Sequence, residues 1–459
     1  MATEIKTRIR MQMPCGISRN MGRSPEASAA VPRLRYKPQF AVFFALMLAA
    51  SMWFYVERVL IPYQVADAVA HARPRGNLSD LYPRWLGARE LLLHQRDPYS
   101  PEVTREIQVG YYGRELDSGR RNDPRDQQGF AYPVYVAFLL APTVRLPFGV
   151  VSAGFRGLLV ILTGATVLLW LQVLAWRPPA WMTVAIIILT IGSFPAAQGI
   201  KLEQLSLLVS GLIAASMAVV SARHLFAAGV LLALATIKPQ LVLPLAAWLL
   251  LWSLTRWKSR QHFFWGFALT MAVLVGGAQL ILPGWIRRFL AALSAYRHYT
   301  AGGGSLLNVL LTPVWGSALA VILLLGLAWL CWKMGCASDD SESFGLTVAL
   351  VLTVTIVVIP MFAPYNQLLL LPAVLFILRR WENLQTRRLG QFACGLAIVI
   401  LGWPWAASVG LVLASMALPK ATVERAWAVP LYTSLYIPLA AMAVLGLAVV
   451  DQLRSGDVR

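Results

Sequence analysis

The stretch QFAVFFALMLAASMWFYVERVL, residues 39–60, is apolar along nearly its whole length, and a polar segment over residues 61–128 follows it. About 20 apolar residues are enough for a helix to cross the hydrocarbon core of a bilayer, so residues 39–60 predict a membrane-spanning helix. The polar segment holds ten of the 21 acidic residues of the chain. Because nearly all of the remainder is apolar, we look for the chemistry of the protein in residues 61–128.

The composition of the whole chain indicates a membrane protein. Hydrophobic residues make up 58% of the 459 residues and charged residues 13%, and the mean hydropathy is +0.63, which excludes an ordinary soluble domain. We expect an all-α polytopic membrane protein with about 12 transmembrane helices and a long first external loop that carries interfacial helices. The candidate spans are 39–60, 130–147, 154–176, 180–197, 203–221, 224–254, 262–282, 307–334, 344–360, 364–380, 390–412 and 428–450.

One of these candidate spans is interrupted. Lys238-Pro239 lies near the middle of residues 224–254, and proline lacks a backbone donor and disfavours helix just before it. We expect a single crossing there. The alternative is two short half-helices, in which case either the parity of the earlier crossings changes or the run 130–147 is re-entrant.

The net charge of +19 helps to predict which parts of the chain lie on the cytoplasmic side of the membrane. Basic residues concentrate in cytoplasmic loops, and the N-terminal tail, residues 1–38, and the C-terminal tail, residues 453–459, are both basic. We therefore expect a cell-membrane protein with a transmembrane domain over residues 39–452 and both termini in the cytoplasm. The catalytic loop 61–128 and a second loop, 283–305, are then extracytoplasmic. A basic surplus of this origin does not indicate nucleic acid as a partner.

Residues 80–95 of the first loop are predicted to form a helix at the membrane surface, because Leu81, Trp85, Ala88 and Leu92 recur at helical spacing. Asp80 at its start has two interpretations. It can cap the helix, as can the neighbouring Ser79, or, as an ionised carboxylate facing a membrane cavity, it can act as a general base.

Two further groups of the external loops are ambiguous. Asp97 precedes Pro98, and an Asp in this position is usually a turn former. Apolar residues at helical spacing over 285–296 predict a second interfacial helix. His298 on that helix is either structural or a contact for a phosphate or a sugar.

Lys238 is a candidate ligand for a phosphate. A lysine in an apolar stretch costs about 2.5 to 3.5 kcal/mol at mid-membrane, so it faces a cavity or a partner, snorkels near a helix end, or forms an ion pair. Lys201, Glu203 and Gln204 border helices, where a solvated loop is the main expectation. The histidines, cysteines and acidic residues show no metal-ligand spacing, so we expect neither a metal nor a cofactor.

The order of several short motifs resembles a known family. An early Asp on a surface helix, Asp97-Pro98-Tyr99, Phe130-Ala131-Tyr132-Pro133, Glu203-Gln204-Leu205, Ala235-Thr236-Ile237-Lys238-Pro239-Gln240, Gly304-Ser305-Leu306 and Ala363-Pro364-Tyr365-Asn366-Gln367 follow one another along residues 40–380. This order is similar to the GT-C superfamily of membrane glycosyltransferases, and within it to the family 87 glycosyltransferases, which include polyprenyl-phosphate-mannose-dependent mannosyltransferases.

The resemblance implies a reaction and a set of site residues. It implies an inverting transfer of a sugar, with mannose favoured, from a polyprenyl-phosphate donor to a glycolipid or glycan acceptor on the outer side of the membrane. Asp80 is then the catalytic base. The substrate-binding candidates are Arg84, Tyr82, Asp97, Tyr99, Tyr132, Gln204, Lys238, His298 and Asn366.

Two other classes of function are alternatives to a glycosyltransferase. A lipid or solute transporter or flippase also has about twelve helices, but transporters of that size tend to show two comparable halves and polar sites at the midplane. This chain has its largest polar segment after the first helix instead. The other class is a polysaccharide polymerase or ligase.

We predict that a cysteine introduced at Ser118 is labelled from the outside of intact cells by a membrane-impermeant maleimide, because the basic tails and the apolar runs place residues 61–128 outside. Labelling before and after permeabilisation is the measurement. A reaction seen only after permeabilisation would contradict both the topology and the assignment of the catalytic loop.

Overall fold

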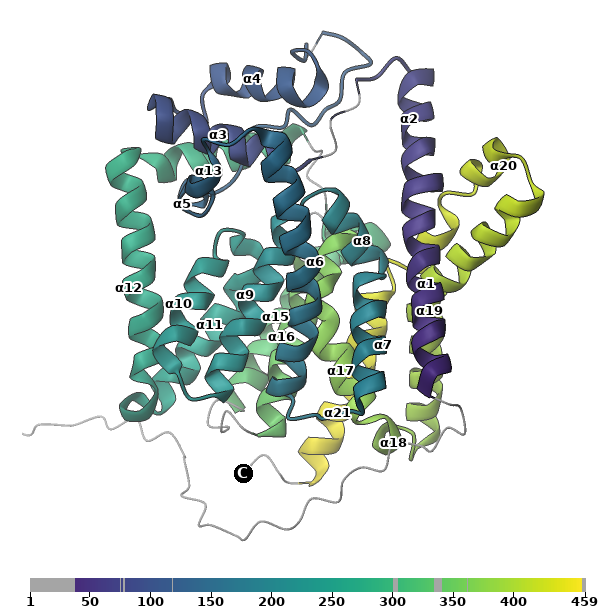
Figure 1. Ribbon diagram of the computed structural model, residues 1–459. Coiled ribbons are helices and arrows are strands. Elements are labelled where there is room, and N and C mark those ends of the chain that lie inside the picture. Colours follow the sequence, from purple (N-terminus) through teal and green to yellow (C-terminus); the bar gives the residue numbers. More distant parts are fainter. Residues whose placement is uncertain are drawn as a thin grey trace, which may run out of the picture.

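The computed structural model describes residues 38–455, apart from positions 75, 77–78, 118, 300–303, 334–340 and 361. Most of the two basic tails lies outside the described residues, as do Ser118, Cys15 and Cys336. Within the described ranges every regular element is a helix (Figure 1). The expectation of an all-α protein is therefore confirmed.

The chain begins with one long helix. α1 (Pro38–Phe54), the π-helix η1 (Tyr55–Leu60) and α2 (Ile61–Ala70) follow one another as an apolar helix of 33 residues. The sequence predicted that this helix ends at residue 60, but it continues to Ala70. Asp67 is the single charged residue of Ile61–Ala70, so this segment can extend the helix. The polar loop thus begins about three turns later than the sequence indicated.

A cap of helices lies over one end of the bundle (Figure 1). It consists of α3 (Tyr82–His94), α4 (Pro101–Tyr112), α5 (Val136–Leu140) and α13 (Trp285–Tyr299). α3 and α13 are the helices that the sequence predicted over 80–95 and 285–298. α3 ends where Gln95 adopts the left-handed conformation, with φ of 55°. The Ser100 side chain then caps α4 by accepting a bond from the Val103 amide.

The bundle below the cap is built around α16 (Glu342–Val358), whose side chains from Phe344 to Val357 are all buried. Its other helices are α6 (Phe148–Val173), α7 (Ala180–Ile191), α8 (Phe194–Lys201), α9 (Leu205–Ser221), α10 (Leu225–Ala235), α11 (Pro239–Thr255), α12 (Trp257–Ile281), α15 (Pro313–Lys333), η3 (Pro364–Leu370), α17 (Leu371–Arg379), α19 (Arg388–Ala417) and α21 (Ile437–Ser455). Short elements complete the chain: η2 (Ala141–Thr143), α14 (Leu306–Leu310), α18 (Trp381–Leu384), α20 (Lys420–Arg425) and η4 (Val429–Leu431).

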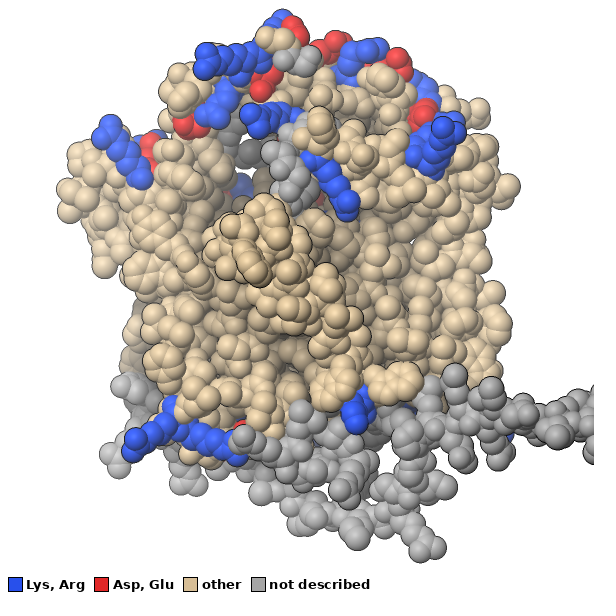
Figure 2. All heavy atoms as spheres, turned by 180° about the vertical axis from the view of Figure 1, so that it is seen from behind, with Lys and Arg blue, Asp and Glu red and all other residues tan. Residues whose placement is uncertain are grey.

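The apolar helices identify a multi-pass membrane protein. Over the described residues, five helices are long and apolar enough to cross a membrane, or six if the bent pair α7 and α8 forms one span, and six other apolar helices are shorter. Figure 2 shows charged side chains gathered at the two ends of the molecule, with a band between them that carries almost none on this face. Such a band matches the hydrocarbon core of a bilayer.

The expectation of a spanning helix over 130–147 is wrong. This run forms only α5, of five residues, and the 3₁₀ turn η2, and five helical residues cover about 7.5 Å. Pro133, Pro142 and Pro147 interrupt the run, and proline in a helix interior removes a hydrogen bond and clashes with the preceding turn. The segment instead packs beneath α3 in the cap.

The expectation of one continuous helix over 224–254 is also wrong. The chain leaves α10 at Ala235, and Lys238 precedes α11 in a non-helical conformation. α10 packs against the first half of α12 at Gly229, where a Cβ would lie 2.2 Å from the Phe263 carbonyl oxygen. The end of α11 meets the same part of α12, because Arg260 donates to the Trp252 carbonyl at 3.0 Å. α10 and α11 therefore run antiparallel as a hairpin, with Lys238 at its tip.

Candidate functional site

Asp80 lies in the loop before α3, and its side chain does not cap that helix. The residue at the cap position is Leu81, which makes no side-chain capping bond, and the neighbouring Ser79 hydroxyl accepts from the Tyr82 amide at 3.3 Å. The Asp80 carboxylate instead accepts a hydrogen bond from the Gln204 side-chain amide, 124 residues away in the chain. The interpretation of Asp80 as a helix cap is therefore wrong.

Lys238, at the tip of the hairpin, points toward the same place. It is buried, with 6% of its surface exposed, and its Nζ donates to Ser206 Oγ at 2.5 Å. Nζ also lies 3.5 Å from Gln204 Oε1 and 3.5 Å from Asn366 Oδ1, and 5.0 Å from the centre of the Tyr365 ring. A snorkelling lysine would reach toward solvent, so this geometry favours the interpretation in which Lys238 faces polar partners inside the protein.

The Gln204 amide connects the carboxylate to the ammonium group. Its Nε2 donates to Asp80 and its Oε1 accepts from Lys238, and only 3% of Gln204 is exposed. Glu203 is buried to the same extent. The expectation of a solvated loop is therefore wrong for both residues, while Lys201 forms a peripheral ion pair with Glu57 at 2.6 Å.

Arg84 brings a second cation to the site. Its Nη1 donates to the Asp80 carbonyl oxygen at 2.8 Å, and its guanidinium carbon lies 4.6 Å from the centre of the Tyr132 ring. Arg84 Nε is buried and has no hydrogen-bond partner. Buried donors are normally paired, so an unpaired guanidinium donor beside a second cation indicates a place for an anionic ligand.

Four tyrosines and a second carboxylate complete the surroundings of Asp80, and only Tyr132 among them was a candidate from the sequence. Tyr111, Tyr296 and Tyr365 each interact electrostatically with Asp80 or Arg84, and so does Asp126. Tyr296 lies on the predicted amphipathic helix and Tyr365 in a quoted motif, so a sequence signal existed for both. Tyr111 and Asp126 carried none beyond their place in the polar loop.

The electrostatics make Asp80 a stronger base than a free aspartate. Burial raises the pKa of the Asp80 carboxyl above its ordinary value, and the nearby Asp126 raises it further, while Arg84, Lys238 and the Gln204 hydrogen bond lower it in part. Burial likewise raises the pKa of Asp126, against a bond from the Gln128 amide. A carboxylate with a raised pKa and two cations within its field is suited to accept a proton near an anionic leaving group.

Four other predicted candidates lie away from Asp80 or serve the architecture. Asp97 forms an ion pair with Arg288 of α13 at 2.7 Å and accepts from the Tyr99 amide at 2.9 Å, as expected for a turn former. The Tyr99 hydroxyl donates to the Tyr132 carbonyl at 2.6 Å. Tyr82 packs on Phe148, and His298 is exposed on α13. The structure therefore gathers Asp80, Arg84, Tyr132, Gln204, Lys238 and Asn366 and leaves Tyr82, Asp97, Tyr99 and His298 outside that group.

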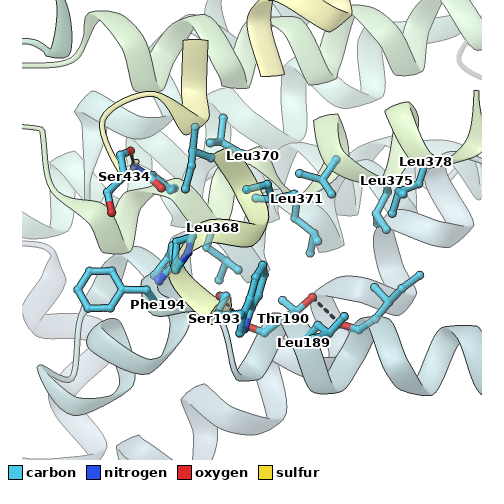
Figure 3. A pocket seen from close by; sticks show the side chains of 18 residues that line it. Leu189, Thr190, Ser193, Phe194, Leu368, Leu370, Leu371, Leu375, Leu378 and Ser434 are labelled. Carbon is cyan, nitrogen blue, oxygen red and sulfur yellow. Dashed lines mark hydrogen bonds between the residues drawn. The ribbon is translucent and has the colours of Figure 1, made fainter. Parts of the chain in front are cut away.

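A separate apolar cavity of about 220 Å³ lies among α7, α8, η3, α17 and α19. Figure 3 shows the leucines of η3 and α17 facing Thr190, Ser193 and Phe194 across it. Gln367 lines this cavity and donates to the Ser434 carbonyl at 2.7 Å, whereas the preceding Asn366 accepts from Ser206 at 2.8 Å in the Asp80 site. No residue of the Asp80 site lines this cavity.

Across the described part of the chain, no group of three or more His, Cys, Asp or Glu side chains is arranged to hold a metal ion. The polar groups around Asp80 are hydroxyls, amides and cations in addition to the two carboxylates. This set is suited to a phosphate and a sugar.

We predict that Asp80→Asn does not lower the thermal stability at neutral pH. A carboxyl whose folded pKa lies above its unfolded value binds its proton more tightly in the folded state, so wild-type stability falls as the pH rises through that pKa. Asparagine avoids this cost. The melting temperature of Asp80→Asn should equal or exceed that of the wild type at pH 7, and the difference should vanish near pH 4, the ordinary aspartate pKa.

Melting temperatures measured from pH 4 to 8 check this prediction. Asp123→Asn is the control, and its melting temperature should change in the opposite direction. Hydrogen bonds from Arg114 and the Asp117 amide lower the pKa of Asp123 to about 2, so its ionised form stabilises the fold above that pH and its loss should lower the melting temperature. A melting temperature of Asp80→Asn several degrees below wild type at pH 7 would contradict the electrostatic description of the site.

The comparisons with known proteins place the chain in a family. The model of glycosyltransferase family 87 matches residues 130–360, which is half of the chain. It covers Tyr132, Gln204 and Lys238, and ends before Asn366, while Asp80 and Arg84 precede it. No curated protein and no solved structure matches the chain. The resemblance in the order of motifs is thus confirmed by an independent match, and with its apolar helical bundle the chain belongs to glycosyltransferase family 87 and is a membrane glycosyltransferase.

Proposed function

We propose that the enzyme transfers a sugar, mannose, from a polyprenyl-phosphate donor to a glycolipid or glycan acceptor on the outer side of the cell membrane. The observation that carries this proposal is the joint position of the Asp80 carboxylate, the Arg84 guanidinium and the Lys238 ammonium in one site at an end of the apolar bundle. A lipid-linked sugar phosphate needs cations for its phosphate and the apolar interior of a bilayer for its prenyl chain. The site supplies the cations, and its position at an end of the apolar bundle leaves the prenyl chain in the bilayer.

The proposed reaction is a direct displacement that inverts the anomeric carbon. Asp80 takes the proton from the acceptor hydroxyl, whose oxygen forms a bond to the anomeric carbon. The bond from that carbon to the phosphate oxygen breaks on the opposite face, and polyprenyl phosphate leaves with both electrons. The raised pKa of Asp80 supports the first step, because a general base is most effective when its pKa lies near the working pH.

Arg84 and Lys238 are the proposed partners of the donor phosphate. Arg84 has a buried Nε donor without a partner, and a guanidinium presents donors in a fork that matches phosphate oxygens. Lys238 is a compact cation held by Ser206 and Gln204. Together they would stabilise the charge that develops on the leaving phosphate.

Amides and aromatic rings are the proposed contacts of the sugar. Gln204 and Asn366 can donate to and accept from sugar hydroxyls, and Asn366 is buried beside Lys238. Tyr132 lies under Arg84, and Tyr296 and Tyr365 flank the charged groups. In this proposal neither a metal nor a cofactor takes part, and the polyprenyl-phosphate sugar is a substrate.

The proposed topology keeps twelve crossings. The α10 and α11 hairpin contributes two in place of one, and the run 130–147 contributes none. The spans are then α1, α6, α7 with α8, α9, α10, α11, α12, α15, α16, α17, α19 and α21. Both termini are cytoplasmic in this arrangement, and the cap that carries Asp80 is extracytoplasmic. Membership of a glycosyltransferase family favours this function over a transporter or flippase.

We expect Asp80→Asn to lower the transfer rate strongly while the protein stays folded. Loss of a general base costs about 10² to 10⁴ in rate. In the assay, purified protein in lipid nanodiscs is incubated with radiolabelled polyprenyl-phosphate mannose and a membrane extract that contains lipids and glycans. The radiolabel that appears in the products measures transfer. In a parallel control reaction a nucleotide sugar replaces the lipid-linked donor and should give no product. A folded variant that keeps more than about a tenth of the wild-type rate would exclude Asp80 as the base.

We expect Lys238→Met to raise the KM for the lipid-linked donor, because methionine keeps most of the length of the side chain but offers no charge to the phosphate. Lys201→Met is the matched control, since Lys201 pairs with Glu57 outside the site. The same nanodisc assay, run over a range of donor concentrations, measures both. An unchanged KM in Lys238→Met would remove Lys238 from the donor site.

A further inference from the structure

Three consecutive residues between α8 and α9 hold the two residues at the start of the catalytic loop. The Leu202 carbonyl accepts from the Asp80 amide at 2.8 Å, the Glu203 carboxylate accepts from the Ser79 hydroxyl at 2.5 Å, and the Gln204 amide donates to the Asp80 carboxylate. We call this set of contacts the 202–204 clamp. It joins segments that lie about 120 residues apart in the chain.

The backbone conformation of Glu203 allows all three residues of the 202–204 clamp to contact Ser79 and Asp80. Glu203 has a φ of +54°, in the left-handed region that residues other than glycine rarely adopt. In a continuous helix successive residues point about 100° apart. The left-handed residue breaks that rotation, so a carbonyl and two successive side chains reach the same short loop.

The Glu203 side chain is itself fixed from a third segment. Only 3% of Glu203 is exposed. Its carboxylate accepts from the Ser152 hydroxyl at 2.5 Å and lies 3.2 Å from Arg156 Nε, both on α6. A buried carboxylate is costly unless it is paired and hydrogen-bonded, and here two hydroxyls and a guanidinium satisfy it. Ser79 is therefore tied to α6 through Glu203.

The contacts of Glu203 are with its own counterion and with the loop. Its carboxylate pairs with Arg156, whereas the charged groups near the Asp80 carboxylate are Arg84, Lys238 and Asp126. In the catalytic loop it accepts a hydrogen bond from Ser79, whose side chain is also buried. This geometry favours an effect of Glu203 through the position of the loop.

We propose that Glu203 is a positioning residue of this glycosyltransferase, which holds Ser79 and thereby keeps the Asp80 carboxylate against Gln204 and within reach of the acceptor. This inference rests on the proposed role of Asp80 as the general base. A displacement of a reacting group by about 1 Å can cost 10²-fold in rate, so a clamp on the base controls kcat. Its influence on KM for the donor should be smaller, because Lys238 binds the donor phosphate from a separate segment, although Arg84 is bonded to the Asp80 carbonyl.

Hydrogen exchange of the wild-type enzyme and its variants in nanodiscs tests the clamp without any substrate. Glu203→Gln keeps the shape of the side chain but replaces one accepting oxygen by a donor, and Ser79→Ala removes the hydroxyl. Both should speed the exchange of amides in peptides covering residues 79–85 by about tenfold, as expected for one lost hydrogen bond. Glu57→Gln, which breaks a peripheral ion pair, should not. Exchange within twofold of wild type in both clamp variants would overturn the proposal.

Activity in a double-mutant cycle tests whether the clamp acts through Asp80. With radiolabelled polyprenyl-phosphate mannose as the probe, Glu203→Gln should lower kcat about tenfold and change KM for the donor by a smaller factor. The same change made in the Asp80→Asn background should cost less than twofold, because the group that it positions is already gone. Losses that multiply would overturn the positioning role. If Asp80→Asn alone were fully active, the base assignment would fail, and the exchange data would still decide whether the clamp exists.

Discussion

The arrangement of the Asp80 carboxylate, the Gln204 amide and the Lys238 ammonium constrains much of this structure. Charged groups withdrawn from water are tolerated only when they are paired and hydrogen-bonded. Here one amide contacts both, with Nε2 donating to the carboxylate and Oε1 accepting from the ammonium, and the Ser206 hydroxyl accepts a shorter bond from the same ammonium. To bring these groups together, the chain must break the helix at Lys238, turn sharply at Glu203 and fold the loop before α3 down onto the bundle.

The parts of the cap are held together by contacts that do not reach Asp80 itself. Asp97 pairs with Arg288 of α13, and the Tyr99 hydroxyl binds the Tyr132 carbonyl. These bonds place Tyr296 and Tyr132 beside the charged groups. An Asp-Pro-Tyr turn therefore contributes to the site through architecture, and its residues need not contact a substrate to matter for activity.

The family match covers one part of the site, and the polar loop and Asn366 of η3 supply the rest. Residues 130–360 contain the bridging amide, the buried lysine and Tyr132. Asp80 and Arg84 come from the polar segment before the matched region, and they contact Gln204 and Tyr132 respectively. The proposed base and one of the two proposed phosphate ligands thus come from a polar segment. The other proposed ligand, Lys238, projects from an apolar hairpin, where hydrogen bonds offset the cost of burying its charge.

Local patterns of the sequence were sufficient for the class of protein, for the helices over 80–95 and 285–298, and for the choice of Asp80 and Lys238 as candidates. Apolar runs and helical spacing are properties of neighbouring residues, so a sequence reveals them. The same patterns failed over 130–147 and 224–254, because apolar content there outweighed the prolines that end the helices. Only the tertiary structure decided that Gln204 bridges Asp80 to Lys238, that Glu203 is buried, and that Tyr111 and Asp126 belong to the site. Gln204 and Glu203 have hydrogen-bond partners that lie 124 residues away in the chain. A buried polar group finds such a partner through packing of the whole bundle, which no local spacing records.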